Sequence, residues 1–211
     1  MRKGDRVTVV AGNSLDTLCV FLGVTSLGGL FSSSSCDMGT AGILERLRQI
    51  KPKWLFVDDT ALYNGKITDL RIKMAGIVEG MKGIAEFEGV ISVPRFLDQP
   101  KNVEGIKGVR SLDTFLEKGE ESGMKFERVG FQDGFLIVYS SGTTGPPKCI
   151  VHGTGSIVLS AWKEGHLHRE MSKDSVALQH TTTGMHNPTN SRDFFLADPL
   201  SASTLPTKED Q

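Results

Sequence analysis

The 211-residue sequence predicts an α/β fold, with a mostly parallel sheet and flanking helices. Short β-branched or apolar runs alternate along the chain with longer segments of helical periodicity. Parallel strands need long crossover connections, so this alternation favours a parallel sheet with helices packed on it. The length suffices for one large or two small domains, and the composition is that of a globular protein with a buried core.

The first elements predict a strand, a turn and a helix. Val7–Ala11 is a β-branched run, and the apolar segment Leu15–Leu27 follows it after a short polar turn. Asn13 or Ser14 in that turn would cap the helix, because both side chains accept hydrogen bonds from the first helical N–H groups. Leu30–Ser34 is the next candidate strand.

Two further helices with strands between them are predicted in the middle of the chain. One helix carries its apolar residues on a single face and stops before Pro52, and the second is expected from Ile67 to Met81 because its apolar spacings keep one stripe. Trp54–Val57 and Val90–Val93 are the candidate strands here. The apolar residues of the first helix are Ile43, Leu44, Leu47 and Ile50.

The second half predicts a loop, a hairpin and two more helices. Phe135–Tyr139 is an apolar strand that runs into a Gly-rich segment, and Cys149–His152 is its candidate return strand. The remaining predictions are a surface loop at Gln99–Arg110, a short helix at Leu112–Lys118, a helix at Ser156–Met171 and a last strand at Val176–Thr182.

Composition excludes several classes of protein. The formal net charge is -1 with acidic and basic residues interleaved, which does not suit binding to nucleic acid or to an anionic membrane. The apolar run Val7–Ala11 is too short for a signal peptide or a membrane span. Cys19, Cys36 and Cys149 fit neither a disulfide framework nor a zinc site. We therefore expect a cytoplasmic location, and we assign no metal ligand to the chain.

The segment Tyr139–Lys148 reads YSSGTTGPPK and carries the clearest functional chemistry. Glycines let the backbone approach a ligand closely, and hydroxyl and N–H groups donate hydrogen bonds to phosphate oxygens. A lysine adds a positive point charge. The alternative is a polar hairpin loop with no ligand. We predict a phosphate-binding site made of Ser140, Ser141, Gly142, Thr143, Thr144, Gly145 and Lys148.

This ten-residue string resembles the signature loop of the adenylate-forming superfamily, which includes acyl-CoA synthetases, luciferases and peptide-synthetase adenylation domains. The stretch from Gly28 to Asp59, and the strings KCIVHGTG, KEGHLHR and LQHTTTG, resemble acetoacetyl-CoA synthetases in particular. The resemblance covers roughly Arg2 to Gly184. It implies that residues 1–184 form a partial AMP-binding domain, and that residues 185–211 are a disordered tail from outside the family.

The resemblance implies an acid-thiol ligase. Such an enzyme uses ATP with Mg²⁺ to convert acetoacetate to an acyl-adenylate, and then transfers the acyl group to coenzyme A. It also implies that residues 141–145 wrap the phosphates, assisted by Lys148. The oligomeric state stays open.

Sequences that match the family's downstream motifs and catalytic lysine do not occur here, so we expect a truncated fragment of the N-terminal domain without turnover by itself. We assign no catalytic residue. The alternatives are an acetyl- or propionyl-CoA synthetase-like fragment, or a non-catalytic remnant with at most weak nucleotide binding.

Overall fold

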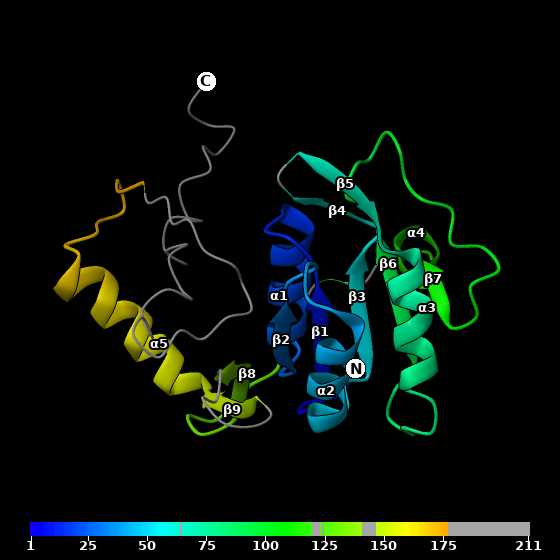
Figure 1. Ribbon diagram of the computed structural model, residues 1–211. Helices are drawn as coiled ribbons and strands as arrows, with labels where there is room; N and C mark the ends of the chain where they lie inside the picture. The colour runs from blue at the N-terminus through cyan, green and yellow to red at the C-terminus, as the bar shows by residue number, and fades with distance from the viewer. Residues whose placement is uncertain (64, 120–122, 124, 141–146, 177–211) are drawn as a thin grey trace.

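A computed structural model describes residues 1–63, 65–119, 123, 125–140 and 147–176 of the chain. In these residues the chain forms a seven-stranded sheet in the order β7-β6-β3-β1-β2-β8-β9, with helices on both of its faces (Figure 1). Every neighbouring pair is parallel except β8 and β9, which are antiparallel. The predicted α/β class with a mostly parallel sheet is confirmed.

The helices and strands have the following bounds. The strands of the large sheet are β1 Arg6–Val10, β2 Leu30–Ser34, β3 Trp54–Asp58, β6 Gly89–Val93, β7 Val109–Ser111, β8 Gly134–Ser140 and β9 Lys148–Gly153. A separate hairpin consists of β4 Thr60–Tyr63 and β5 Lys66–Asp69. The helices are α1 Leu15–Ser26, α2 Thr40–Ile50, α3 Arg71–Gly80, α4 Leu112–Leu116, α5 Thr154–Trp162 and the π-helix Lys163–His168.

Helix boundaries follow local chemistry. The Ser14 hydroxyl accepts the Thr17 N–H at 3.1 Å and caps α1, as one of the two predicted caps. Helix α2 ends at Ile50, where Lys51 adopts a left-handed conformation with φ 46° and Pro52 follows. Ser111 caps α4 in the same way as Ser14 caps α1, through the Thr114 N–H.

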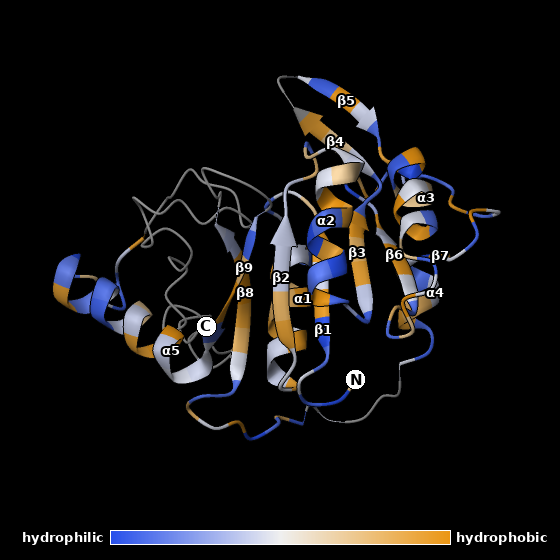
Figure 2. Ribbon diagram, turned by 60° about the horizontal axis from the view of Figure 1, so that its bottom comes forward, coloured by the Kyte–Doolittle hydropathy of each residue, from blue (hydrophilic) through white to orange (hydrophobic). Residues whose placement is uncertain are grey.

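Two hydrophobic cores lie on opposite faces of the sheet, because successive side chains of a strand point to opposite sides. In β3, Phe56 packs in the core that also contacts α1, α4 and α5, whereas Leu55 and Val57 pack in the core with α2 and α3. Figure 2 colours β3 as hydrophobic along most of its length. Burial on both faces explains why the parallel strands read as continuous apolar runs.

The prediction of a helix from Ile67 to Met81 is wrong in its first part. Residues 60–69 form the β4–β5 hairpin instead, and α3 begins at Arg71. The Ile67 side chain is 63% exposed, so it does not extend the apolar stripe that buries Met74 and Ile77. Gly65 has φ 73°, a turn conformation, and the Asn-Gly pair at 64–65 is a hairpin signal that the helical reading overlooked.

Four other predictions differ from the structure or lie outside the described residues. The loop expected at Gln99–Arg110 contains the first two residues of β7, and the helix expected at Ser156–Met171 changes to a π-helix after Trp162. The strand expected at Val176–Thr182, beyond its first residue, and the tail 185–211 lie outside the described residues.

Candidate functional site

The carboxyl ends of β1, β2, β3, β6 and β8 all meet at one edge of the sheet, because these strands are parallel. In open α/β sheets this edge is where ligands bind. The predicted phosphate-binding segment Tyr139–Lys148 begins with the last two residues of β8, which lie at this edge.

The structure places Ser140 and Lys148 opposite each other. Ser140 is the last residue of β8 and Lys148 is the first residue of β9, and the two are paired in the antiparallel ladder. Ser140 is half-buried and Lys148 is exposed. The other predicted site residues, Ser141, Gly142, Thr143, Thr144 and Gly145, lie outside the described residues. The predicted pairing of Phe135–Tyr139 with a return strand at Cys149–His152 is confirmed.

Strand β8 is fixed in the sheet by its buried residues. Leu136, Ile137 and Val138 are at most 4% exposed. The buried Ser32 hydroxyl of β2 donates to the Ile137 carbonyl oxygen of β8 at 2.9 Å, so a side-chain hydrogen bond also links the two strands. The Tyr139 side chain is also buried, and burial raises the pKa of its hydroxyl. The strand that leads into the predicted phosphate-binding segment is therefore part of the buried core.

A buried carboxylate lies elsewhere on the same edge. Asp58 ends β3 and is 2% exposed, and its Oδ2 accepts the Gly12 N–H at 2.8 Å. Burial raises the pKa of Asp58 from 3.8 to about 6, although the Gly12 N–H and the charge of Arg95 act in the opposite direction. Two strands, β1 and β2, separate β3 from β8, which amounts to about 14 Å across the sheet at roughly 4.8 Å per strand. Asp58 is therefore not part of the β8–β9 hairpin.

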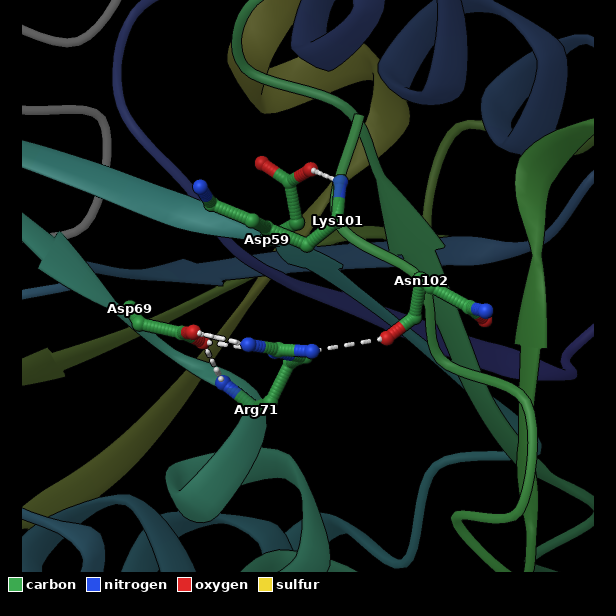
Figure 3. Close-up of polar contacts among 5 residues, drawn as sticks. All are labelled: Asp59, Asp69, Arg71, Lys101 and Asn102. Carbon is green, nitrogen blue, oxygen red and sulfur yellow. Dashed lines mark hydrogen bonds and ion pairs between the residues drawn. The ribbon is translucent and has the colours of Figure 1, made fainter. Parts of the chain in front are cut away.

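The neighbouring Asp59 joins three segments of the chain. Its Oδ1 accepts the Arg95 N–H at 2.9 Å and its Oδ2 accepts the Lys101 N–H at 2.7 Å. Figure 3 shows the Lys101 bond, and beside it Arg71, which pairs with Asp69 and donates to the Asn102 carbonyl oxygen. Asp59 is 1% exposed and both of its oxygens are engaged, so its role is to hold the 95–101 loop against β3.

The sequence predicts a strand at Trp54–Val57 but no role for Asp58 and Asp59, which directly follow it. A carboxylate directly after a buried strand of a parallel sheet is the signal that could have found them, since such residues lie at the ligand-binding edge. The hydrogen-bond partners of Asp59 are not predictable, because Arg95 and Lys101 come from a loop 36 and 42 residues later.

The described residues contain neither a candidate metal-binding cluster nor a candidate membrane-spanning helix. In that part of the chain no group of three or more histidine, cysteine, aspartate or glutamate side chains is arranged to hold a metal ion. None of the helices described is long and apolar enough to cross a membrane.

A mostly parallel α/β sheet with a Gly/Ser/Thr-rich hairpin at its carboxyl edge defines a class of proteins that bind ligands beyond the strand ends. Within this class, the family model of the AMP-binding enzymes matches residues 1–185. The chain belongs to the AMP-binding enzyme family.

Its relatives include acetoacetyl-CoA synthetases. The enzyme of Rattus norvegicus is 35% identical over 188 residues, which cover 87% of this chain and 28% of the relative. The enzyme of Rhizobium meliloti is 33% identical over 181 residues, 86% of this chain and 27% of the relative. The solved structure of acetoacetyl-CoA synthetase from Streptomyces lividans superimposes with a TM-score of 0.76 at 29% identity, covering 88% of this chain and 27% of that one. The chain thus spans little more than a quarter of the length of these relatives.

Proposed function

We propose that this chain supplies the phosphate-binding part of the ATP site of an acid-thiol ligase that converts acetoacetate to acetoacetyl-CoA. The proposal rests on one observation: the β8–β9 hairpin carries Ser140 and Lys148 side by side at the carboxyl edge of the sheet. The relatives are acetoacetyl-CoA synthetases, which supports acetoacetate as the acid and coenzyme A as the acceptor of the acyl group. In this proposal residues 1–184 are part of an AMP-binding domain, and the protein is cytoplasmic.

The hairpin's own residues fit nucleotide phosphates. The Lys148 side chain is exposed and can reach a ligand as a mobile positive charge, and the Ser140 hydroxyl can donate one hydrogen bond. We include Ser141, Gly142, Thr143, Thr144 and Gly145 in the proposed site because backbone N–H groups of Gly-rich turns bind anions. Mg²⁺ would accompany the nucleotide, since it binds substrate phosphates with few protein ligands.

In the proposed reaction the hairpin would position the phosphates of ATP and neutralise their negative charge. Preorganised donors aimed at phosphate oxygens stabilise the charge that develops as the α-phosphate is attacked by the acid's carboxylate and pyrophosphate leaves. The proposed role of Lys148 is to hold the leaving pyrophosphate oxygens.

Binding of ATP tests this proposal. We expect the 211-residue chain to bind Mg-ATP in calorimetric titration, and Lys148→Met to raise the dissociation constant about tenfold, because it removes one charged contact worth ~1.5 kcal/mol. Lys107→Met is the matched control, since Lys107 is exposed and lies in the loop before β7 at the opposite edge of the sheet. Equal dissociation constants for the wild type and Lys148→Met would contradict the assignment of Lys148, and absence of binding by the wild type would contradict the proposed site.

The acid is tested separately by exchange of labelled pyrophosphate into ATP. Exchange that requires acetoacetate, and does not occur with acetate or propionate, would support the proposed substrate. We expect no exchange by the 211-residue chain alone, so exchange that requires acetoacetate would contradict the prediction of a fragment without turnover and would support the ligase assignment.

A further inference from the structure

Helix α2 contacts both strands of the hairpin. The Tyr139 hydroxyl of β8 donates to the Arg46 carbonyl oxygen at 3.0 Å. The Gln49 side-chain Nε2 donates to the Pro147 carbonyl oxygen, also at 3.0 Å. Arg46 and Gln49 are three residues apart and so share one face of the helix. Helix α2 therefore holds the chain on each side of the segment 141–146.

These two bonds lie next to the described residues of the proposed phosphate site. Tyr139 directly precedes Ser140, and Pro147 directly precedes Lys148. The backbone position of Lys148 is thus set by its pairing with Ser140 and by the bond from Gln49 to the preceding carbonyl.

The two attachments differ in strength and accessibility. The Tyr139 ring is 4% exposed, and the Arg46 guanidinium carbon lies 5.3 Å from its centroid, so this attachment belongs to the packed core. The Gln49 side chain is exposed, so its bond competes with water and is the weaker of the two. A change at Gln49 can therefore shift the start of β9 without disturbing the core.

We propose that Gln49 is a positioning residue for nucleotide binding: its side-chain amide holds the Pro147 carbonyl oxygen and thereby places Lys148 against the phosphates. This inference rests on the proposed function of the hairpin. Its physical basis is that a charge–phosphate contact weakens steeply when the donor moves away from its optimal distance. Helix α2 then acts as part of the nucleotide site without touching the nucleotide.

The test compares two substitutions at Gln49: methionine, which keeps the side-chain length, and lysine, which is one atom longer. Gln49→Met removes the donor without adding charge, and we expect it to raise the dissociation constant for Mg-ATP about threefold to tenfold at unchanged thermal midpoint. Gln49→Lys restores a donor. At high salt, where its added charge is screened, we expect this variant to bind Mg-ATP as tightly as the wild type does under the same conditions. Gln99→Met makes the same chemical change at an exposed loop glutamine, and we expect no effect there.

A second readout separates failure of this inference from failure of the proposed function. Hydrogen exchange of the amides at 148–153 reports the position of β9 without any nucleotide. We expect faster exchange there in Gln49→Met, with unchanged exchange in β6. If the wild type does not bind Mg-ATP, the proposed function fails, and faster exchange at 148–153 still supports the attachment through Gln49. If the wild type binds and Gln49→Met binds equally well, or if exchange at 148–153 is unchanged, the positioning role is overturned.

Discussion

Replacing Asp59 by alanine is expected to lower the free energy of unfolding by about 3 kcal/mol, because two part-buried backbone N–H groups lose their buried acceptor at once. The N–H groups of Arg95 and Lys101 donate to the two oxygens of this carboxylate at 2.9 and 2.7 Å. An alanine leaves both donors without this partner, and each costs about 1–3 kcal/mol when it stays buried. Chemical denaturation measured by circular dichroism gives the difference directly.

Asp69→Ala is the matched control for this prediction. Asp69 also carries a carboxylate with short contacts, since its Oδ2 lies 2.6 Å from Nη2 of Arg71, but both side chains are 40% exposed. Exposed ion pairs contribute at most about 1 kcal/mol, so we expect a small effect. The interpretation of Asp59 as the attachment of the 95–101 loop fails if the two alanine variants are equally stable. It also fails if Asp59→Ala does not increase hydrogen exchange in that loop.

Most of the sheet was predictable because its strands are buried on both faces. The predicted strand Leu30–Ser34 matches β2 in both bounds, and Trp54–Val57 differs from β3 by one residue. A strand that is buried on both sides needs a continuous run of residues that can be buried. Such a run is visible in the sequence even when the neighbouring strands are unknown. The serines of β2 satisfy this requirement through a hydrogen bond, since the Ser32 hydroxyl reaches the Ile137 carbonyl oxygen.

The β4–β5 hairpin was not predicted because the apolar residues over Ile67–Met81 have the spacing of a single helix. Ile67, Leu70 and Met74 have helical spacing, yet only the last two are buried. The main-chain N–H of Leu70 donates to the Asp59 carbonyl oxygen at 2.9 Å, and this long-range bond fixes the chain just before α3. This long-range hydrogen bond overrides the helical spacing of the apolar residues, and that spacing gives no sign of the bond.

The candidate site also has one part that the sequence predicts and one part that it does not. The hairpin was predicted from Tyr139–Lys148 because strand, Gly-rich turn and return strand are contiguous in sequence. Its attachment to α2 was not predictable, because Gln49 and Pro147 are 98 residues apart and nothing in either local sequence indicates the other.

The Asp58→Asn variant is expected to be more stable than the wild type at pH 7, by up to about 3 kcal/mol. Burial raises the pKa of Asp58 from 3.8 to about 6, so the folded protein binds this proton more tightly than the unfolded chain does. Folding stability from this group is therefore fully present below pH 4 and is lost as the pH rises to about 6. Each unit of pKa difference corresponds to about 1.4 kcal/mol.

Asparagine keeps the shape of the side chain and an oxygen that can accept the Gly12 N–H, but it has no proton to lose. The free energy of unfolding of Asp58→Asn should therefore equal that of the wild type near pH 4 and exceed it increasingly up to about pH 6. Other carboxylates act in the opposite direction, since the pKa values of Asp5 and Asp69 are lowered, but their contributions cancel in the difference between the two proteins. Urea denaturation at several pH values between 4 and 7 measures this difference. A difference that does not change with pH would show that Asp58 ionises in the folded protein as easily as in the unfolded chain, because Arg95 and the Gly12 N–H then compensate for its burial.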